Sequence, residues 1–214
     1  MNKQNITIFL VRHGEIDNPN RIIYGRNIDL LLNKQGEKQI INLAKSIKKM
    51  EYHPTKIFTS PLSRAVKSAK ILASFFSINR KNLRIDNNLI DNSIPVFAGQ
   101  KLSELEKLYK RGIDEYNEQF IKRGNESKEQ IITRMFFALR KIIKENFGET
   151  VIIVSHGDPI WLLLFRLVNI TSKDIPLSSN YIKSDYLEKG EAWRLIFDKD
   201  YSLIDKNLVK GVNK

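Results

Sequence analysis

The chain has 214 residues, of which 42% are hydrophobic and 28% charged, with 36 basic side chains, 24 acidic ones and no cysteine. This length and composition predict one globular domain, residues 1–214, with a sizeable core. The absence of cysteine excludes disulfides, zinc–thiolate sites and a cysteine nucleophile.

The longest strongly apolar run, residues 160–165, is far shorter than the roughly 20 residues that span a bilayer. The first residues also lack the basic, apolar and small-residue regions of a secretory signal peptide. We therefore expect a cytoplasmic protein that has no membrane partner.

The formal net charge of +12 has two interpretations. Clustered basic residues can bind nucleic acid, whereas lysines at helical spacing simply solvate an exposed face. Five lysines fit the second interpretation: Lys34, Lys38, Lys45, Lys48 and Lys49. The chain has no nucleic-acid-binding motif, so we expect no nucleic-acid partner. A positive surface would instead steer small phosphorylated anions toward the protein.

The first predicted element is a buried strand, the apolar run from Ile6 to Val11. It ends at the triplet Arg12-His13-Gly14, which is followed by an irregular stretch. Asn33 then predicts the cap of an amphipathic helix that extends from about Lys34 to Met50.

The next predicted unit is a short strand, Lys56–Thr59, followed by a helix. Ser60 and Pro61 predict the start of this helix, with serine as the cap and proline at the first helical position. Arg64 lies in its first turn, off the apolar stripe, and a short strand at 83–85 follows the helix.

Residues 86–125 form the least regular part of the chain. The pattern predicts a loop over 87–100 and helical structure over 102–120, with a break at Gly112. We interpret this segment as an insertion that covers the active site and not as a second domain.

The last third of the chain begins with a long helix, opened by the capping box Ser127–Gln130 and closed at Gly148. A second apolar strand, 151–155, follows, and then His156-Gly157 and a buried helix over 159–168. Strand-like runs at 181–186 and 192–197 end the fold, and the polar tail from about residue 206 is expected to fray. The alternation of strands and helices predicts a three-layer α/β/α sandwich with a mostly parallel central sheet.

Four basic side chains fall at the ends of predicted strands or the starts of helices: Arg12, His13, Arg64 and His156. Ligands of open α/β sheets bind at the carboxyl ends of the strands. Such a cluster would repel itself without an anion, and two arginines can grip a tetrahedral dianion through forked hydrogen bonds. Because a neutral histidine can attack phosphorus, these residues predict a phosphoryl-transfer pocket that needs no metal.

Three motifs resemble the signatures of the histidine phosphatase superfamily, which has the phosphoglycerate mutase-like fold. They are residues 10–15 (LVRHGE), 59–65 (TSPLSRA) and 154–157 (VSHG). Their order and spacing match across nearly the whole chain. The resemblance implies that His13 is phosphorylated and then hydrolysed, that Arg12, Arg64 and His156 bind the phosphoryl group, and that no cofactor or metal takes part.

The family also uses a general acid, commonly a glutamate in a Leu-x-Glu stretch before a Trp-Glu-Gly-like segment. Here Leu89-Ile90-Asp91 precedes Phe97-Ala98-Gly99 at the matching spacing, so the resemblance implies Asp91 as the acid. Aspartate is one methylene shorter than glutamate. Glu15, beside the nucleophile, is the alternative acid.

The loop after the first motif departs from the family pattern. Ile16 and Pro19 stand where threonine and asparagine are usual, so Asn18 or Asn20 is a candidate for the missing phosphate contact. Gly25 lies in a segment that matches the family's Gly-Arg…Asp pattern, and it is a further candidate for contact with the substrate phosphate.

The predicted function is a metal-independent phosphatase acting on a small phosphorylated metabolite through a phosphohistidine. One alternative is a mutase that returns the phosphoryl group to a bound phosphoglycerate. Another is a non-catalytic phosphate-binding module, which Asp91 and Ala98 keep open. A metal site built on the two histidines is a fourth hypothesis, disfavoured by the flanking arginines. The sequence identifies neither the leaving group nor the oligomeric state.

Overall fold

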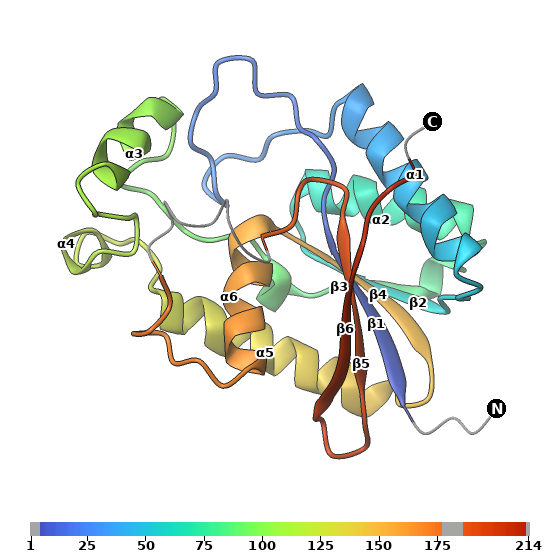
Figure 1. Ribbon diagram of the computed structural model, residues 1–214. Helices are drawn as coiled ribbons and strands as arrows, with labels where there is room; N and C mark the ends of the chain where they lie inside the picture. Colours follow the sequence, from blue (N-terminus) through green and yellow to red (C-terminus); the bar gives the residue numbers. More distant parts are fainter. Residues whose placement is uncertain (1–4, 177–185, 213–214) are drawn as a thin grey trace.

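The computed structural model describes residues 5–176 and 186–212. The described elements, in chain order, are β1 (Ile6–Arg12), α1 (Lys34–Lys49), β2 (Lys56–Thr59), α2 (Ser63–Phe75), η1 (Arg80–Asn82), β3 (Leu83–Ile85), η2 (Asn87–Leu89), α3 (Leu102–Tyr109), α4 (Glu118–Ile121), α5 (Lys128–Glu145), β4 (Thr150–Ser155), α6 (Gly157–Leu167), β5 (Ala192–Phe197) and β6 (Leu203–Val209). Within these ranges, six strands form one sheet in the order β3-β2-β4-β1-β5-β6 (Figure 1).

The sheet is parallel over β3, β2, β4 and β1, and antiparallel where β5 and β6 join it. In the register of the parallel part, Arg12 pairs with Ser155 and Thr59 pairs with Val154. The carboxyl ends of β1, β2 and β4 therefore meet at one edge of the sheet. The predicted α/β fold with a mostly parallel central sheet is confirmed.

Strand β1 shows why helices cover both faces of the sheet. Successive strand residues point to opposite faces. Ile8 and Leu10 pack into the core beneath α5 and α6, whereas Phe9 and Val11 pack beneath α1 and α2. All four side chains are fully buried, so β1 is the apolar centre of a three-layer arrangement (Figure 1).

Two of the predicted helix starts are confirmed and one is wrong. Asn33 caps α1 by accepting from the Gly36 N–H, and Ser127 forms the capping box of α5. Helix α2, however, begins at Ser63 instead of Pro61, and Ser60 is not its cap. The Ser60 hydroxyl contacts the ring of His156 and accepts from the Leu62 N–H, which keeps 60–62 in a turn.

The tail predicted to fray is instead an edge strand. In β6, Leu208 pairs with Trp193 and Val209 pairs with Ala192, while the Lys206 ammonium lies 4.4 Å from the centre of the Trp193 ring. An edge strand exposed to solvent needs no apolar alternation, and its charged residues Asp205 and Lys206 discourage pairing with another sheet. The polar residues at 205–207, in the middle of this segment, therefore concealed the strand from the sequence pattern. The strand predicted at 181–186 lies largely outside the described residues, and Tyr186 itself is not in a strand.

The segment 86–125 contains α3 and α4, with the predicted break between them. Ile94, Phe97, Leu105 and Phe120 of this segment form a small apolar cluster with Ile23 of the loop after β1. The segment packs beside the carboxyl edge of the sheet, where α3 supplies one wall of a cavity.

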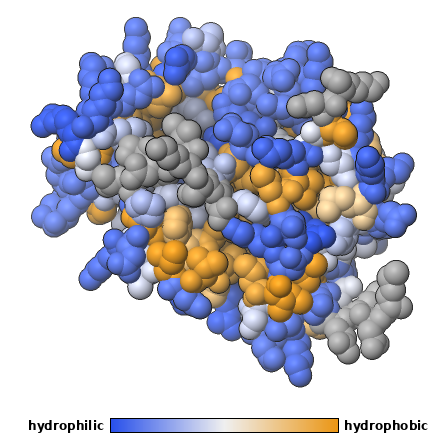
Figure 2. All heavy atoms as spheres, in the orientation of Figure 1, coloured by the Kyte–Doolittle hydropathy of each residue, from blue (hydrophilic) through white to orange (hydrophobic). Residues whose placement is uncertain are grey.

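Hydrophilic side chains cover much of the face shown in Figure 2, with apolar patches between them. The five lysines of α1 and its N-terminus that were predicted to be solvated are all exposed. No helix in 5–176 or 186–212 has the length and apolar character needed to cross a bilayer.

Candidate active site

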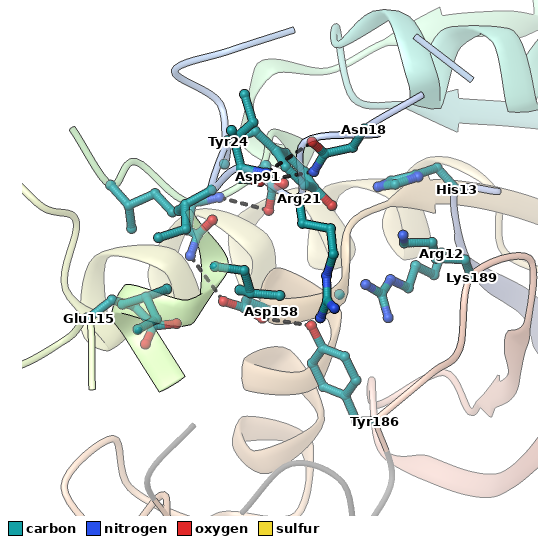
Figure 3. Close-up of a pocket in the computed structure, with 18 of the residues that line it drawn as sticks. Arg12, His13, Asn18, Arg21, Tyr24, Asp91, Glu115, Asp158, Tyr186 and Lys189 are labelled. Carbon is teal, nitrogen blue, oxygen red and sulfur yellow. Dashed lines mark hydrogen bonds between the residues drawn. The ribbon is translucent and has the colours of Figure 1, made fainter. Parts of the chain in front are cut away.

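A cavity of about 540 Å³ opens at the carboxyl edge of the parallel strands. Its walls come from the end of β1, the loop 15–25, the segment 91–115, the start of α6 and residues 186–189 (Figure 3). The cavity therefore lies where an open α/β sheet binds its ligands.

His13 is buried on the floor of this cavity, directly after β1. Its Nδ1 lies 2.7 Å from the Gly14 carbonyl oxygen, which can only accept, so Nδ1 carries the proton. Burial, followed by the charges of His156, Arg64 and Arg12, lowers the pKa of His13 well below its usual range. The ring is therefore neutral at physiological pH, with its lone pair on Nε2.

Two glycines allow the tight packing that holds His13. A Cβ on Gly14 would lie 2.4 Å from the Gly36 carbonyl oxygen, and a Cβ on Gly36 would lie 2.2 Å from that of Glu15. A larger residue at either position would clash, so the segment that follows β1 and the first turn of α1 are in direct backbone contact.

Arg12 is anchored at the cavity by two contacts. Its Nη1 donates to the Leu187 carbonyl at 2.6 Å, and its guanidinium lies 5.0 Å from the centre of the Tyr186 ring. Among the described residues, its buried Nε has no hydrogen-bond partner.

Arg64 is completely buried, in the first turn of α2. Its Nη2 donates to the Gly25 carbonyl at 2.7 Å and to Oδ2 of Asp91 at 2.8 Å, and its guanidinium stacks on Tyr24. Its Nη1 lies 3.6 Å from Oδ1 of Asp29, which is an ion pair and not a hydrogen bond. Within the described part of the chain, neither Nη1 nor Nε has a hydrogen-bond partner. Because buried donors normally bind an acceptor, the free donors of Arg12 and Arg64 point to an anion as ligand.

His156 follows β4, the strand beside β1, so the two His-Gly steps meet as predicted. The rings of His13 and His156 have centres 5.1 Å apart, and Nε2 of His156 lies 2.7 Å from the Ser60 hydroxyl oxygen. Burial and the charge of Arg64 lower the pKa of His156 well below its usual range.

The structure brings both candidate acids to the cavity wall. Asp91 is buried, with Oδ2 beside Arg64 and 3.5 Å from Nδ1 of His156. Glu15 is partly exposed and pairs with Lys189. Asp91 is thus the carboxylate that contacts the cationic cluster, and its role as the acid stays a prediction.

A family model described as the histidine phosphatase superfamily (branch 1) matches residues 8–180. The chain belongs to this superfamily. It is similar to phosphoglycerate mutase-like protein 4 of Arabidopsis thaliana, with 26% identity over 204 residues that cover 93% of this chain and 87% of the relative. It is 30% identical over 178 residues to a metal-independent phosphoserine phosphatase of the same plant, covering 77% of this chain and 70% of the relative.

Solved structures of the superfamily share the fold. Bacillus stearothermophilus YhfR has a TM-score of 0.74 at 21% identity, over 92% of this chain and 94% of that one. The phosphoglycerate mutase from Bacillus anthracis has a TM-score of 0.74 at 19% identity, over 99% and 95%. The predicted superfamily and its phosphoglycerate mutase-like fold are therefore confirmed.

In this member of the superfamily, Asn18 and Gly25 bind other parts of the protein itself. The Asn18 amide bonds both the N–H and the carbonyl of Ile22, at 3.0 and 2.9 Å, which closes a loop on the cavity wall. The Gly25 carbonyl accepts from Arg64. Their predicted contacts with a substrate phosphate stay predictions, and Asn20 is exposed and does not line the cavity.

Sequence reasoning missed a second group of polar residues on the cavity wall, centred on Asp158. Tyr186 donates to Oδ1 of Asp158 at 2.8 Å, while Tyr116 and Asn92 donate to Oδ2 at 2.7 and 3.0 Å. Burial raises the pKa of Asp158. A carboxylate two residues after a motif histidine, in the first turn of a helix, was the signal that could have revealed it.

Glu115 lies on the opposite side of the cavity from His13 and Arg12 (Figure 3). Its Oε2 accepts from the Tyr109 hydroxyl at 2.9 Å. Burial, followed by the charge of Asp158, raises the pKa of Glu115 to about 8. Glu115 lies between α3 and α4 without any periodic pattern, so no feature of the sequence indicated it.

Within the described residues, no group of three or more His, Cys, Asp or Glu side chains could hold a metal ion. The two histidines instead share their surroundings with Arg12 and Arg64, whose charges favour an anion.

Proposed function

We propose that this histidine phosphatase hydrolyses small phosphomonoesters through a phosphohistidine on His13, without a metal. The observation that carries the proposal is the tautomer of His13. Its Nδ1 is bonded to the Gly14 carbonyl, which leaves the lone pair on Nε2, beside two arginines with free buried donors. A neutral nucleophile next to fixed cations is the arrangement that phosphoryl transfer needs.

In the first step, Nε2 of His13 attacks phosphorus and the ester P–O bond breaks. Arg12 and Arg64 hold the phosphoryl oxygens, and a hydrogen bond from His156 adds to the positive surroundings. The leaving oxygen takes a proton from the carboxyl group of Asp91. In the second step, water attacks the phosphohistidine, Asp91 accepts a proton from that water, and the P–N bond breaks to release phosphate.

The ion pair of Asp91 and Arg64 places the proposed general acid next to the proposed phosphate site. Without substrate, Oδ2 of Asp91 accepts from Nη2 of Arg64. A phosphate dianion competes for that donor and places negative charge beside Asp91. Substrate binding therefore releases the Asp91 carboxyl group from Arg64 and leaves it next to the phosphate, where it can pass a proton to the leaving oxygen.

The cavity supports a small substrate. Its volume of about 540 Å³ lies within the range of ordinary ligand pockets and leaves room for a compact leaving group beside the phosphate. One relative is named as a metal-independent phosphoserine phosphatase and another as a broad-specificity phosphatase. We propose a small phosphorylated metabolite as the substrate class.

The proposal is tested by phosphate release from p-nitrophenyl phosphate in EDTA, with wild type, His13→Ala and His53→Ala. His53 is exposed and does not line the cavity, so its variant is the matched control. We expect turnover in wild type and the control, none in His13→Ala, and an acid-labile, base-stable phosphoryl label on His13 in rapidly quenched wild type.

Three other results would contradict the proposal. Activity that disappears in EDTA would indicate a metal enzyme. Transfer between phosphoglycerates with a bisphosphorylated primer, without net phosphate release, would indicate a mutase. Neither release nor labelling of His13 with any phosphomonoester would indicate a phosphate-binding module.

A further inference from the structure

We infer that Arg134, together with Glu126, is a positioning residue that holds the Asp91 carboxyl group in place for catalysis. This inference rests on the proposed function. Arg134 lies in the middle of α5 and does not line the cavity. Its guanidinium donates to the backbone of the loop that carries Asp91, so we infer that it acts through that loop and not on the substrate.

The guanidinium of Arg134 binds three carbonyl groups of that loop. Its Nη1 donates to the carbonyls of Asn88, at 2.8 Å, and Ile90, and its Nη2 donates to that of Asp91 at 3.1 Å. Carbonyls that converge on one cation fix the path of the backbone on both sides of residue 90. The Asp91 side chain then leaves the loop in one direction, toward Arg64 and His156.

The carboxylate of Glu126 binds the guanidinium of Arg134 and fixes its orientation. It accepts from Nε and Nη2 of Arg134, at 2.8 and 3.2 Å, and from the Ser93 N–H at 3.2 Å. The Glu126 N–H also donates to the Ser93 carbonyl. The forked pair is largely buried, with exposed fractions of 13% and 7% for the side chains of Arg134 and Glu126, so solvent competes little for its hydrogen bonds.

The hydrogen bonds at this position require the planar set of donors that arginine has. Five donors in a plane can satisfy a carboxylate and several carbonyls at once, whereas lysine offers one compact ammonium. An acid displaced by about 1 Å can cost on the order of 10²-fold in rate. We therefore expect the loss of Arg134 to reproduce the loss of Asp91 as an acid, while leaving the cationic phosphate site intact.

The test compares two substrates that differ in their need for an acid. p-Nitrophenolate leaves without protonation, whereas an alkoxide from a simple alkyl phosphate requires it. The comparison uses kcat/KM, which reports the phosphorylation of His13 and not the hydrolysis of the phosphohistidine that both substrates share. For Arg134→Gln we expect kcat/KM on the alkyl phosphate to fall by about 10²-fold and kcat/KM on p-nitrophenyl phosphate to change by less than about fivefold. Arg134→Lys should fall between wild type and Arg134→Gln. Arg140→Gln, an exposed arginine on the same helix, is the control and should match wild type.

The decisive measurement is a double-mutant cycle. If Arg134 acts through Asp91, adding Arg134→Gln to Asp91→Asn should change the alkyl phosphate rate by less than about twofold. Equal losses on both substrates, or a further large loss in the Asp91→Asn background, would overturn the inference and indicate a general structural role. Absence of turnover in wild type would refute the proposed function, and this inference with it.

Each variant is checked by its urea unfolding midpoint before kinetics. If Arg134→Gln does not fold, Glu126→Gln is used for the same test. This substitution weakens the salt bridge with Arg134 and keeps the shape of the side chain. Its expected result is the same selective loss on the alkyl phosphate, and a uniform loss would overturn the inference.

Discussion

Oδ2 of Asp91 lies 2.8 Å from Nη2 of Arg64, where the proposed mechanism places a phosphate oxygen. The carboxylate therefore competes with the substrate for one donor of a wholly buried arginine. Substrate binding must break this ion pair, and the same event changes the charge around Asp91.

Replacing Asp91 by asparagine should separate binding from catalysis. The variant removes the competing charge, so we expect inorganic phosphate to inhibit about tenfold more tightly at neutral pH. Hydrolysis of an alkyl phosphate should fall by about 10²–10⁴-fold, because the leaving alkoxide no longer receives a proton. Steady-state inhibition and turnover measure both effects. Asp17→Asn removes the same charge from an exposed position and should change neither.

Two outcomes would contradict this view of Asp91. Unchanged or weaker phosphate binding would show that the carboxylate does not compete with the anion. A normal alkyl phosphate rate in Asp91→Asn, together with a large loss in Glu15→Gln, would transfer the acid role to Glu15.

The three histidines should differ in their response to pH. The pKa values of His13 and His156 are lowered, chiefly by burial, so both rings should stay neutral as pH falls from 7.5 through 6.5. Protonation, and loss of the nucleophile, should follow only at lower pH. Ring resonances observed by NMR provide the measurement, with the exposed His53 as internal reference. A midpoint near 6.5 for His13 would mean that neither burial nor the charges of Arg64 and Arg12 shift the pKa of its ring.

The sequence predicted the buried framework of the site well. Apolar runs ending in Arg12-His13 and in Ser155-His156 required two neighbouring strands whose ends meet, and the structure has them paired in register. The cap of α1 and the capping box of α5 were equally readable, because each depends on a few local residues. Local chemistry and burial set these features, so one sequence suffices to predict them.

The features that the sequence did not predict depend on contacts between residues far apart in the chain. Ser60 reads as a helix cap, yet its hydroxyl contacts His156, 96 residues away in sequence. Strand β6 reads as a polar tail because an edge strand needs no apolar face. No sequence pattern around Glu115 indicates a functional residue, and only the fold brings it to the cavity wall.

Gly157→Ala should damage the phosphate site through Arg12. A Cβ on Gly157 would lie 2.2 Å from the Tyr186 hydroxyl oxygen and 3.1 Å from Cζ of Arg12, so both side chains must shift. We expect KM for p-nitrophenyl phosphate to rise by about tenfold or more, since a misplaced arginine loses its forked contact. Adding Tyr186→Phe, which removes the closest atom, should restore part of this loss. An equal KM in the single and double variants would show that the Tyr186 hydroxyl is not the obstacle.

Glu115→Gln should change how stability depends on pH. The pKa of Glu115 is raised from 4.5 to about 8 in the folded protein, so between these values the folded chain holds a proton that the unfolded chain has released. The free energy of unfolding of wild type therefore loses this contribution as pH rises from 4.5 to about 8, and the glutamine variant, with no proton to lose, should not.

The measurement is the urea unfolding free energy of both proteins at several pH values. The advantage of Glu115→Gln over wild type should grow by several kcal/mol, up to about 5 kcal/mol, across that window and then level off. Taking the difference cancels the histidine contributions, which both proteins share. Glu51→Gln, at an exposed position, is the control and should follow wild type. A difference that is flat with pH would mean that Glu115 is ionised in the folded protein, and its side of the cavity would then carry a full negative charge facing the substrate.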